Sequence, residues 1–292
     1  MKWSVWTEAA RMRTLPASFI PVLTGGALAW HHQLINWPVS VITLCCAVLI
    51  QIATNFANDY FDYKHGADTG ERIGFTRATS TGDISPAKML TVTLVLFFVA
   101  FLLGLILVWH AGWPVLLIGL LSITAGLLYT GGPYPLAYHG LGDLFVFLFF
   151  GIIAVTGTYY VNSLQWSTEA LLASIAIGAL STMILVANNY RDVHTDRKAA
   201  KNTLVVLFGE RFSRWQFLGL ALLAFSVPPC FYLYKSYPPL VMLPLILSPW
   251  AILLIRRFWL ETEKKNFNRI LIQTAQLMAI YGILFSMGIV LS

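Results

Sequence analysis

Long apolar segments separated by short polar ones constrain the fold of this 292-residue chain more than any other feature. Hydrophobic residues make up 58% of the sequence and charged residues 11%, whereas soluble domains usually carry about 25% charged residues. A membrane-spanning helix needs roughly 20 mostly apolar residues. Nine segments meet that need, near 15–35, 38–57, 88–109, 112–129, 143–163, 168–188, 214–234, 238–255 and 270–291. The sequence therefore predicts one all-α integral membrane domain over residues 1–292, with nine transmembrane helices in one bundle.

The distribution of basic residues predicts how this bundle is oriented, because lysine and arginine favour cytoplasmic loops. With nine spans, 18 of the 19 basic residues fall on one side of the membrane, and only Lys235 falls on the other. The N-terminus is therefore predicted to be cytoplasmic, as are the two long loops, near 58–87 and 189–213. The net charge of +6 then reflects membrane topology and gives no reason to expect nucleic acid as a partner.

A first cluster of Asn and Asp residues lies at the end of the second predicted span. Asn55 and Asp59 are four residues apart, and so are Asn58 and Asp62. Residues four apart share a face of a helix, so several oxygen ligands are predicted to point in one direction. Asp68 follows in the predicted loop.

A second cluster lies at the end of the sixth predicted span. Asn188, Asp192 and Asp196 follow one another at intervals of four residues, again along one helix face. His194 is two residues from both aspartates, so it is predicted to face away from them. A single aspartate in such a place is best explained as a solvated charge at the membrane surface. Two clusters of related spacing instead favour a shared function.

The chemistry of the two clusters suits magnesium and a diphosphate. Magnesium takes oxygen ligands and is commonly held by one or two carboxylates together with substrate phosphates. Two clusters on facing helices could hold two ions with a diphosphate between them. The predicted metal ligands are Asn58, Asp59, Asp62, Asp68, Asp192 and Asp196. The basic residues among them would contact phosphate oxygens, and these are Arg77, Arg191, Arg197 and Lys201.

Further motifs extend this pattern, and together they resemble the UbiA-type family of intramembrane aromatic prenyltransferases. The resemblance covers nearly the whole chain. Besides the two clusters, its carriers are Arg13 to Ser18, Arg72-Ile-Gly74, Arg77, Gly82-Asp-Ile-Ser85, Tyr129-Thr-Gly131, Gly140-Leu-Gly-Asp143, Gly157-Thr-Tyr-Tyr160 and Lys201 to Gly209. The Asn55-x2-Asn58-Asp start is typical of the branch that acts on 1,4-dihydroxy-2-naphthoate in menaquinone synthesis. A common form of the family motif spaces its last two aspartates four apart, whereas Asp62 and Asp68 are six apart, so Asp68 is expected to have a secondary role.

The resemblance implies a central cavity within the bundle, a place in the inner membrane and a reaction. The reaction transfers a polyprenyl group from a polyprenyl diphosphate to 1,4-dihydroxy-2-naphthoate with loss of CO2 and diphosphate, giving demethylmenaquinone. Two magnesium ions would bridge the diphosphate. The expected catalytic residues are Asn58, Asp62, Asp192 and Asp196. The expected substrate-binding residues are Asn55, Lys64, Arg77, Tyr129, Asn188, Arg191, Arg197 and Lys201. The segment 131–143 either shapes the acceptor pocket or is a simple Gly/Pro turn.

Other functions remain open at this stage. The acceptor could be another aromatic acid, such as 4-hydroxybenzoate or homogentisate. The CDP-alcohol phosphotransferases also use clustered aspartates at helix ends, but their motif has an Asp-Gly pair followed by Ala-Arg, and neither cluster shows that order. A transporter would place its acidic residues near the bilayer midplane in broken helices, whereas here they lie at span ends.

Overall fold

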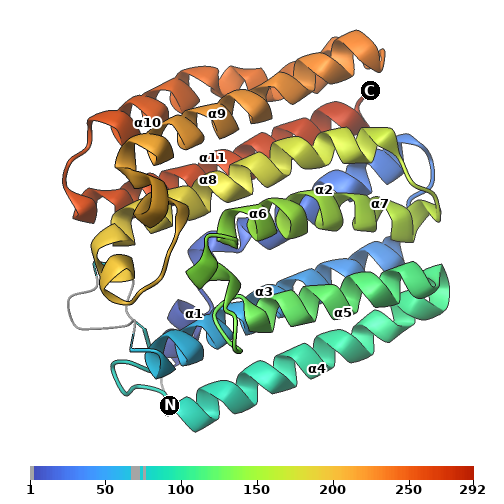
Figure 1. The fold of residues 1–292 in the computed structure, drawn as a ribbon. Coiled ribbons are helices and arrows are strands. Elements are labelled where there is room, and N and C mark those ends of the chain that lie inside the picture. The colour runs from blue at the N-terminus through green and yellow to red at the C-terminus, as the bar shows by residue number, and fades with distance from the viewer. Residues whose placement is uncertain (1–2, 67–72, 75–76) are drawn as a thin grey trace.

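The computed structural model describes residues 3–66, 73–74 and 77–292, and within these ranges every regular element is a helix. Figure 1 shows long helices lying alongside one another in one bundle, with the two ends of the chain at opposite ends of the bundle. A chain that crosses a membrane an odd number of times has its two ends on opposite sides, which agrees with this arrangement. The predicted all-helical bundle is confirmed.

The described part of the chain contains nine consecutive helical segments after a short helix α1 (Trp3–Ala9) and a turn η1 (Met12–Thr14). They are α2 (Pro16–His31), α3 (Trp37–Lys64), α4 (Pro86–Ala111), α5 (Trp113–Leu128), the run α6–η3–α7 (Gly142–Val146, Phe147–Ile153 and Ala154–Ser163), α8 (Thr168–Lys198), α9 (Leu204–Tyr234), η4–α10 (Pro239–Leu247 and Ser248–Leu260) and η5–α11 (Lys264–Asn266 and Phe267–Val290). The turn η2 (Leu136–His139) lies between α5 and α6.

Seven of these segments are long and apolar enough to cross a membrane, counting only the described residues. The two exceptions are α2 and α5, which have 16 residues each. A helix of that length covers about 24 Å, against a hydrocarbon core of about 30 Å. The structure therefore makes the first and fourth predicted spans shorter than the sequence suggested, because α2 ends at a turn through Gln33 and α5 begins only after Gly112, both with positive φ.

The helices that carry the two Asn/Asp clusters both begin at a side-chain cap. Asn36 accepts a hydrogen bond from the Val39 amide at the start of α3, and Ser167 accepts from the Glu169 and Ala170 amides at the start of α8. From there α3 runs for 28 residues and α8 for 31, about 42–46 Å and longer than the hydrocarbon core. The clusters therefore lie on the last helical turns, where the sequence had suggested loops from residues 58 and 189.

One close helix contact is made by a stretch of π-helix, η3, against the buried central helix α8. A Cβ atom added to Gly151 of η3 would lie 2.5 Å from the Gly178 Cα and 2.7 Å from the Ser174 carbonyl oxygen. Only glycine allows the two backbones to approach so closely, as small residues often do between membrane helices. This contact fixes η3, whose residues form one wall of the cavity described below.

We expect Gly151→Val to destabilise the bundle, because the added methyl groups have no space between η3 and α8. Overpacking of this kind typically costs about 1–3 kcal/mol. The thermal melting temperature in detergent should fall by several degrees. Gly219→Val is the matched control, since a Cβ atom there meets no atom within 4 Å. Equal melting temperatures for the two variants would contradict the assigned contact.

Candidate active site

Residues from both Asn/Asp clusters line one cavity of about 340 Å³. Asn58 and Asp62 reach it from the end of α3, and Asn188 reaches it from the end of α8. Two basic residues, Arg77 and Lys201, complete this polar end. Segments that are far apart in the sequence are thus brought together at one end of the cavity.

Asp62 is buried and paired at this polar end. It is 1% exposed, and its Oδ2 atom accepts a hydrogen bond from Arg77 Nη2 at 2.8 Å. Its Oδ1 atom accepts from the Tyr138 hydroxyl at 3.1 Å. Because a buried carboxylate needs compensating partners, the arginine and the phenol together make this position possible.

Tyr138 of η2 connects the two clusters. Its hydroxyl binds Asp62 of the first cluster, while its ring lies under the Lys201 ammonium at 5.5 Å. The Tyr138 carbonyl also accepts from the Asn202 amide at 3.0 Å. The sequence had not singled out this tyrosine as a site residue, although it lies in the segment 131–143 considered for the acceptor pocket.

Asp59 is engaged differently from Asp62. Its two carboxylate oxygens accept hydrogen bonds from the backbone amides of Ala78 and Thr79, each at 3.1 Å. Asp59 thereby fixes the segment that directly follows Arg77 and so helps to aim that arginine at Asp62. The structure places Asp59 outside the walls of this cavity and in the wall of a neighbouring one.

The two asparagines of the first cluster bind other parts of the chain. Asn58 accepts a hydrogen bond from the Thr130 hydroxyl at 2.8 Å, at the end of α5. Asn55 donates to the Ala10 carbonyl at 3.0 Å, which anchors the N-terminal arm. Lys64 is exposed, and Asp68 lies outside the described residues.

Arg191 is the centre of the second cluster and is 1% exposed. It forms a two-pronged pair with Asp192, with Nε–Oδ1 and Nη2–Oδ2 distances of 2.8 and 2.6 Å. Nη2 also donates to the Asn188 side chain at 2.8 Å, and Nη1 donates to Asn268 of α11 at 2.8 Å. Asn268 in turn donates to the Ile73 carbonyl at 3.2 Å, which ties α11 to the segment between the clusters.

The remaining residues of the second cluster divide into a buried and an exposed group. Asp196 is buried and lies 3.8 Å from the Lys201 ammonium. Arg197 and His194 are exposed, and His194 faces away from the aspartates as predicted. Asn188 lines both cavities, whereas the walls given by the described residues do not include Asp192 or Asp196.

A second cavity, of about 390 Å³, adjoins the polar end of the first. The N-terminal arm forms one side of it, and Arg77, Asn188 and Arg191 form the other. Arg11 lines both cavities and has a left-handed backbone, with φ of 54°. The sequence pointed to this region through the motif from Arg13 to Ser18 and through its positive charge, and Arg11 was not predicted as a site residue.

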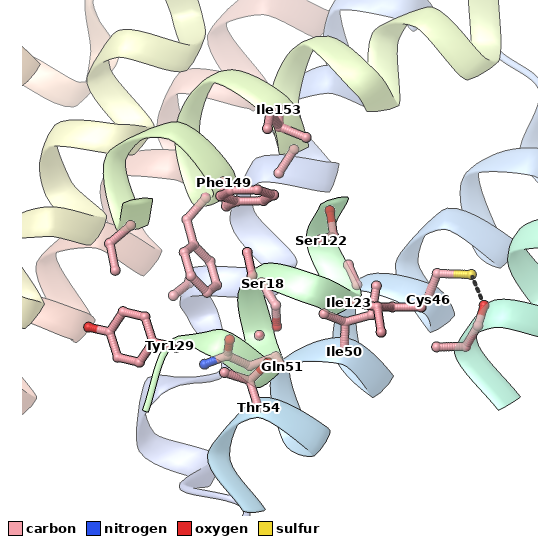
Figure 2. A pocket seen from close by; sticks show the side chains of 18 of the residues that line it. Ser18, Cys46, Ile50, Gln51, Thr54, Ser122, Ile123, Tyr129, Phe149 and Ile153 are labelled. Carbon is pink, nitrogen blue, oxygen red and sulfur yellow. Dashed lines mark hydrogen bonds between the residues drawn. The ribbon is translucent and has the colours of Figure 1, made fainter. Parts of the chain in front are cut away.

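The rest of the first cavity is mostly apolar and extends between the helices. Figure 2 shows Tyr129 at the end of α5 and Phe149 of η3 directed towards it, with Gln51 and Thr54 contributed by α3. Tyr129, one of the residues expected to bind substrate, thus lines this cavity. An elongated molecule with a charged head and an apolar tail would match these two parts of the cavity.

The donor set at the polar end fits a magnesium ion held jointly with a phosphate. Its ligand atoms are carboxylate and amide oxygens, which hard cations prefer. In the described part of the chain, no three His, Cys, Asp or Glu side chains gather closely enough to hold a metal by themselves. Magnesium usually keeps waters and binds one or two carboxylates together with substrate phosphates, and Asp62, Asn58 and Asn188 supply oxygens of this kind at the polar end.

Comparison with known proteins gives concordant results. Residues 18–283 match the model of the UbiA prenyltransferase family. A 1,4-dihydroxy-2-naphthoate octaprenyltransferase of Haemophilus influenzae is 34% identical, over 99% of this chain and 97% of that protein. An enzyme of the same name from Mycobacterium tuberculosis is 39% identical over 75% of both chains. The solved structure of a UbiA homologue from Archaeoglobus fulgidus bound to GPP and Mg2+ covers 99% of this chain and 100% of that one, with a TM-score of 0.68 and 14% identity.

We expect Asp59→Ala to lower the melting temperature, because it leaves the buried amides of Ala78 and Thr79 without their acceptor. An unpaired buried amide costs about 1–3 kcal/mol. Asp59→Asn, which keeps one acceptor oxygen, should have an intermediate effect. Asp83→Ala, an exposed aspartate in the same segment, serves as the control. A melting temperature of Asp59→Ala equal to that of the control would exclude this structural role.

Proposed function

The chain belongs to the UbiA prenyltransferase family, and we propose that it transfers a polyprenyl group from a polyprenyl diphosphate to 1,4-dihydroxy-2-naphthoate. The direct product is the quinol form of demethylmenaquinone, because the two hydroxyl groups of the acceptor are kept, and CO2 and diphosphate are released. One structural observation carries the proposal: a single cavity has Asp62 of the first cluster, Asn188 of the second and basic residues at one end, and apolar walls beyond them. The relatives named for the same reaction support the choice of acceptor over 4-hydroxybenzoate or homogentisate.

We propose that all nine helical segments cross the inner membrane, with the N-terminus and the active site facing the cytoplasm. The position of 18 of the 19 basic residues on one side supports this orientation. The positions of the chain ends at opposite ends of the bundle support an odd number of crossings. The shorter helices α2 and α5 can cross where neighbouring helices cover their ends, since a bilayer adapts to short spans at modest cost.

We propose that Asn58, Asp62, Asp192 and Asp196 bind two magnesium ions together with the diphosphate. Magnesium, when bound, would neutralise the charge that develops on the departing diphosphate. In the structure, Asp62 is paired with Arg77, Asp192 with Arg191 and Asp196 with Lys201. A magnesium diphosphate brings both a cation for the acids and an anion for the bases, so each partner can be exchanged without leaving a buried charge alone.

The basic residues and asparagines have distinct proposed roles. Arg77 and Lys201 line the cavity and contact the diphosphate, and Asn188 binds it beside them. Arg191 orients Asp192, because its donors already bind protein acceptors. Asn55 holds the N-terminal arm at the site, and Asp59 holds the segment after Arg77. The exposed Lys64 and Arg197 attract the anionic substrate to the entrance, and Asp68 is a secondary metal ligand.

The apolar part of the cavity suits the carbon chemistry. The bond between the first prenyl carbon and the diphosphate oxygen breaks with its electron pair going to diphosphate. The resulting allyl cation needs a water-poor, π-rich environment, and each cation–π contact contributes about 0.5–2 kcal/mol. Tyr129 and Phe149 are placed for such contacts. The acceptor ring carbon forms the new bond to the prenyl carbon, and the carboxylate on that ring carbon leaves as CO2.

Purified protein should prenylate 1,4-dihydroxy-2-naphthoate in preference to 4-hydroxybenzoate when both are offered with a polyprenyl diphosphate and magnesium. Mass spectrometry of the products identifies the acceptor and reveals the loss of CO2. Asp62→Asn and Asp192→Asn should reduce turnover by about 100-fold or more, since each removes a charge that balances the metal. Glu263→Ala, at an exposed site, is the control. Near-normal turnover in both aspartate variants would refute the site assignment.

The proposed orientation predicts the reactivity of single cysteines in a background lacking Cys45, Cys46 and Cys230. A membrane-impermeant maleimide should label Gln165→Cys in intact cells, because this exposed residue lies between α7 and α8, which the proposed orientation assigns to the outer side. Lys265→Cys, exposed between α10 and α11, should react only after the membrane is permeabilised. The reverse pattern would invert the topology and place the active site outside.

A further inference from the structure

We propose that three glycines, Gly104 of α4, Gly119 of α5 and Gly157 of α7, keep the far half of the cavity wide and thereby set the length of polyprenyl chain that the protein accepts. All three line the cavity that holds Asp62 at its polar end. The inference rests on the proposed function, since it assigns this half of the cavity to the hydrocarbon tail of the donor.

The cavity follows α3 for most of that helix. Asp62 lies at its polar end and Thr43 lines its far end, and at 1.5 Å per residue these positions are about 28 Å apart. Around this far end an apolar cluster packs between α3, α4, α5 and α7. Its buried members are Val39, Cys46, Leu107, Ala111, Val115 and Val161, of which Cys46, Leu107, Val115 and Val161 also line the cavity. A tail that starts at the diphosphate can therefore extend a long way along α3 within the cavity.

The three glycines lie in the far half. On α5, Gly119 is about 15 Å along the helix from Tyr129. On α4, Gly104 lies one turn beyond Ala100, whose carbonyl accepts from the Cys46 Sγ atom at 3.6 Å. On α7, Gly157 lies one turn before Val161, a member of that apolar cluster. A short tail ends before this level, whereas a long tail must pass it.

Each glycine leaves space that a larger residue would occupy. A Cβ atom at Gly104 or Gly119 would meet no atom of the described residues within 4 Å, and at Gly157 the nearest would be Ile118 Cδ1 at 3.7 Å. Gly126 shows the contrast, because it also lines the cavity but its Cβ would lie 2.5 Å from Thr54 Oγ1. Gly126 is therefore required by helix packing, and the other three are not.

Because helix packing does not require these three glycines, another cause must explain the space they leave. Glycine is the least favourable helix residue after proline, so a helix interior without a need for space favours alanine or leucine. An empty apolar space also forfeits contacts that side chains would otherwise make. Three helices, α4, α5 and α7, each lack these side-chain contacts along the same section of the cavity. A tail that occupies the section restores the missing contacts and explains all three positions together.

The test compares Gly104→Leu and Gly119→Leu with the unsubstituted protein, using geranyl, farnesyl, geranylgeranyl and solanesyl diphosphates with 1,4-dihydroxy-2-naphthoate. Geranyl transfer should stay within about twofold, because a short tail does not reach the new side chains. The kcat/KM for geranylgeranyl and solanesyl diphosphates should fall about tenfold or more, as expected for overpacking. Gly219→Leu, in α9 and away from the cavity, controls for replacing an open helix glycine.

An unchanged preference among donors would overturn the inference and would mean that the tail leaves the bundle before the glycines. An equal loss for every donor at an unchanged melting temperature would also overturn it. If a leucine variant is too unstable to measure, Gly104→Ala replaces it, and the ratio of kcat/KM for long donors to kcat/KM for short donors is compared in the same way. No product from the unsubstituted protein with any donor would contradict the proposed function itself, and this inference with it.

Discussion

Pairing of buried acids with buried bases at the ends of α3 and α8 is the interaction on which this structure depends. Asp62 with Arg77 and Asp192 with Arg191 are almost completely removed from solvent. Removing one partner from such a pair is strongly destabilising, because it leaves an uncompensated charge. Each pair also binds a neighbour, through Tyr138 for the first and Asn268 for the second. The polar end is thus held by contacts from many parts of the chain.

This arrangement explains why the site carries so many basic residues beside its acids. A diphosphate needs positive charge, and magnesium needs carboxylates, but neither set is stable alone next to an apolar cavity. Packed against each other, the two sets neutralise their charges. Asp59 differs from the paired acids, because its partners are two backbone amides instead of a cation. These hydrogen bonds hold the segment that follows Arg77 and so position that arginine.

Much of this could be predicted from the sequence because helical periodicity is local. The four-residue spacing of Asn188, Asp192 and Asp196 places them on one face only if α8 continues beyond the apolar region, and it does. Contacts between distant segments were not predictable in this way. Arg11, Tyr138 and Asn268 reach the site from the N-terminal arm, η2 and α11, and no spacing in the sequence connects those elements to the clusters. The partners of Asp59 could not be predicted either, because they are backbone amides of a loop.

The glycines of the bundle show how one residue type serves two opposite requirements. Gly151 removes a side chain so that η3 can touch α8, and the backbone of the neighbouring helix fills the space. Gly104 and Gly119 remove a side chain and nothing in the described residues fills the space. Sequence alone cannot distinguish these cases, since both are glycines in apolar helices. The distinction lies in what surrounds the missing Cβ, so a cavity lined by open glycines is better evidence for a ligand than its volume.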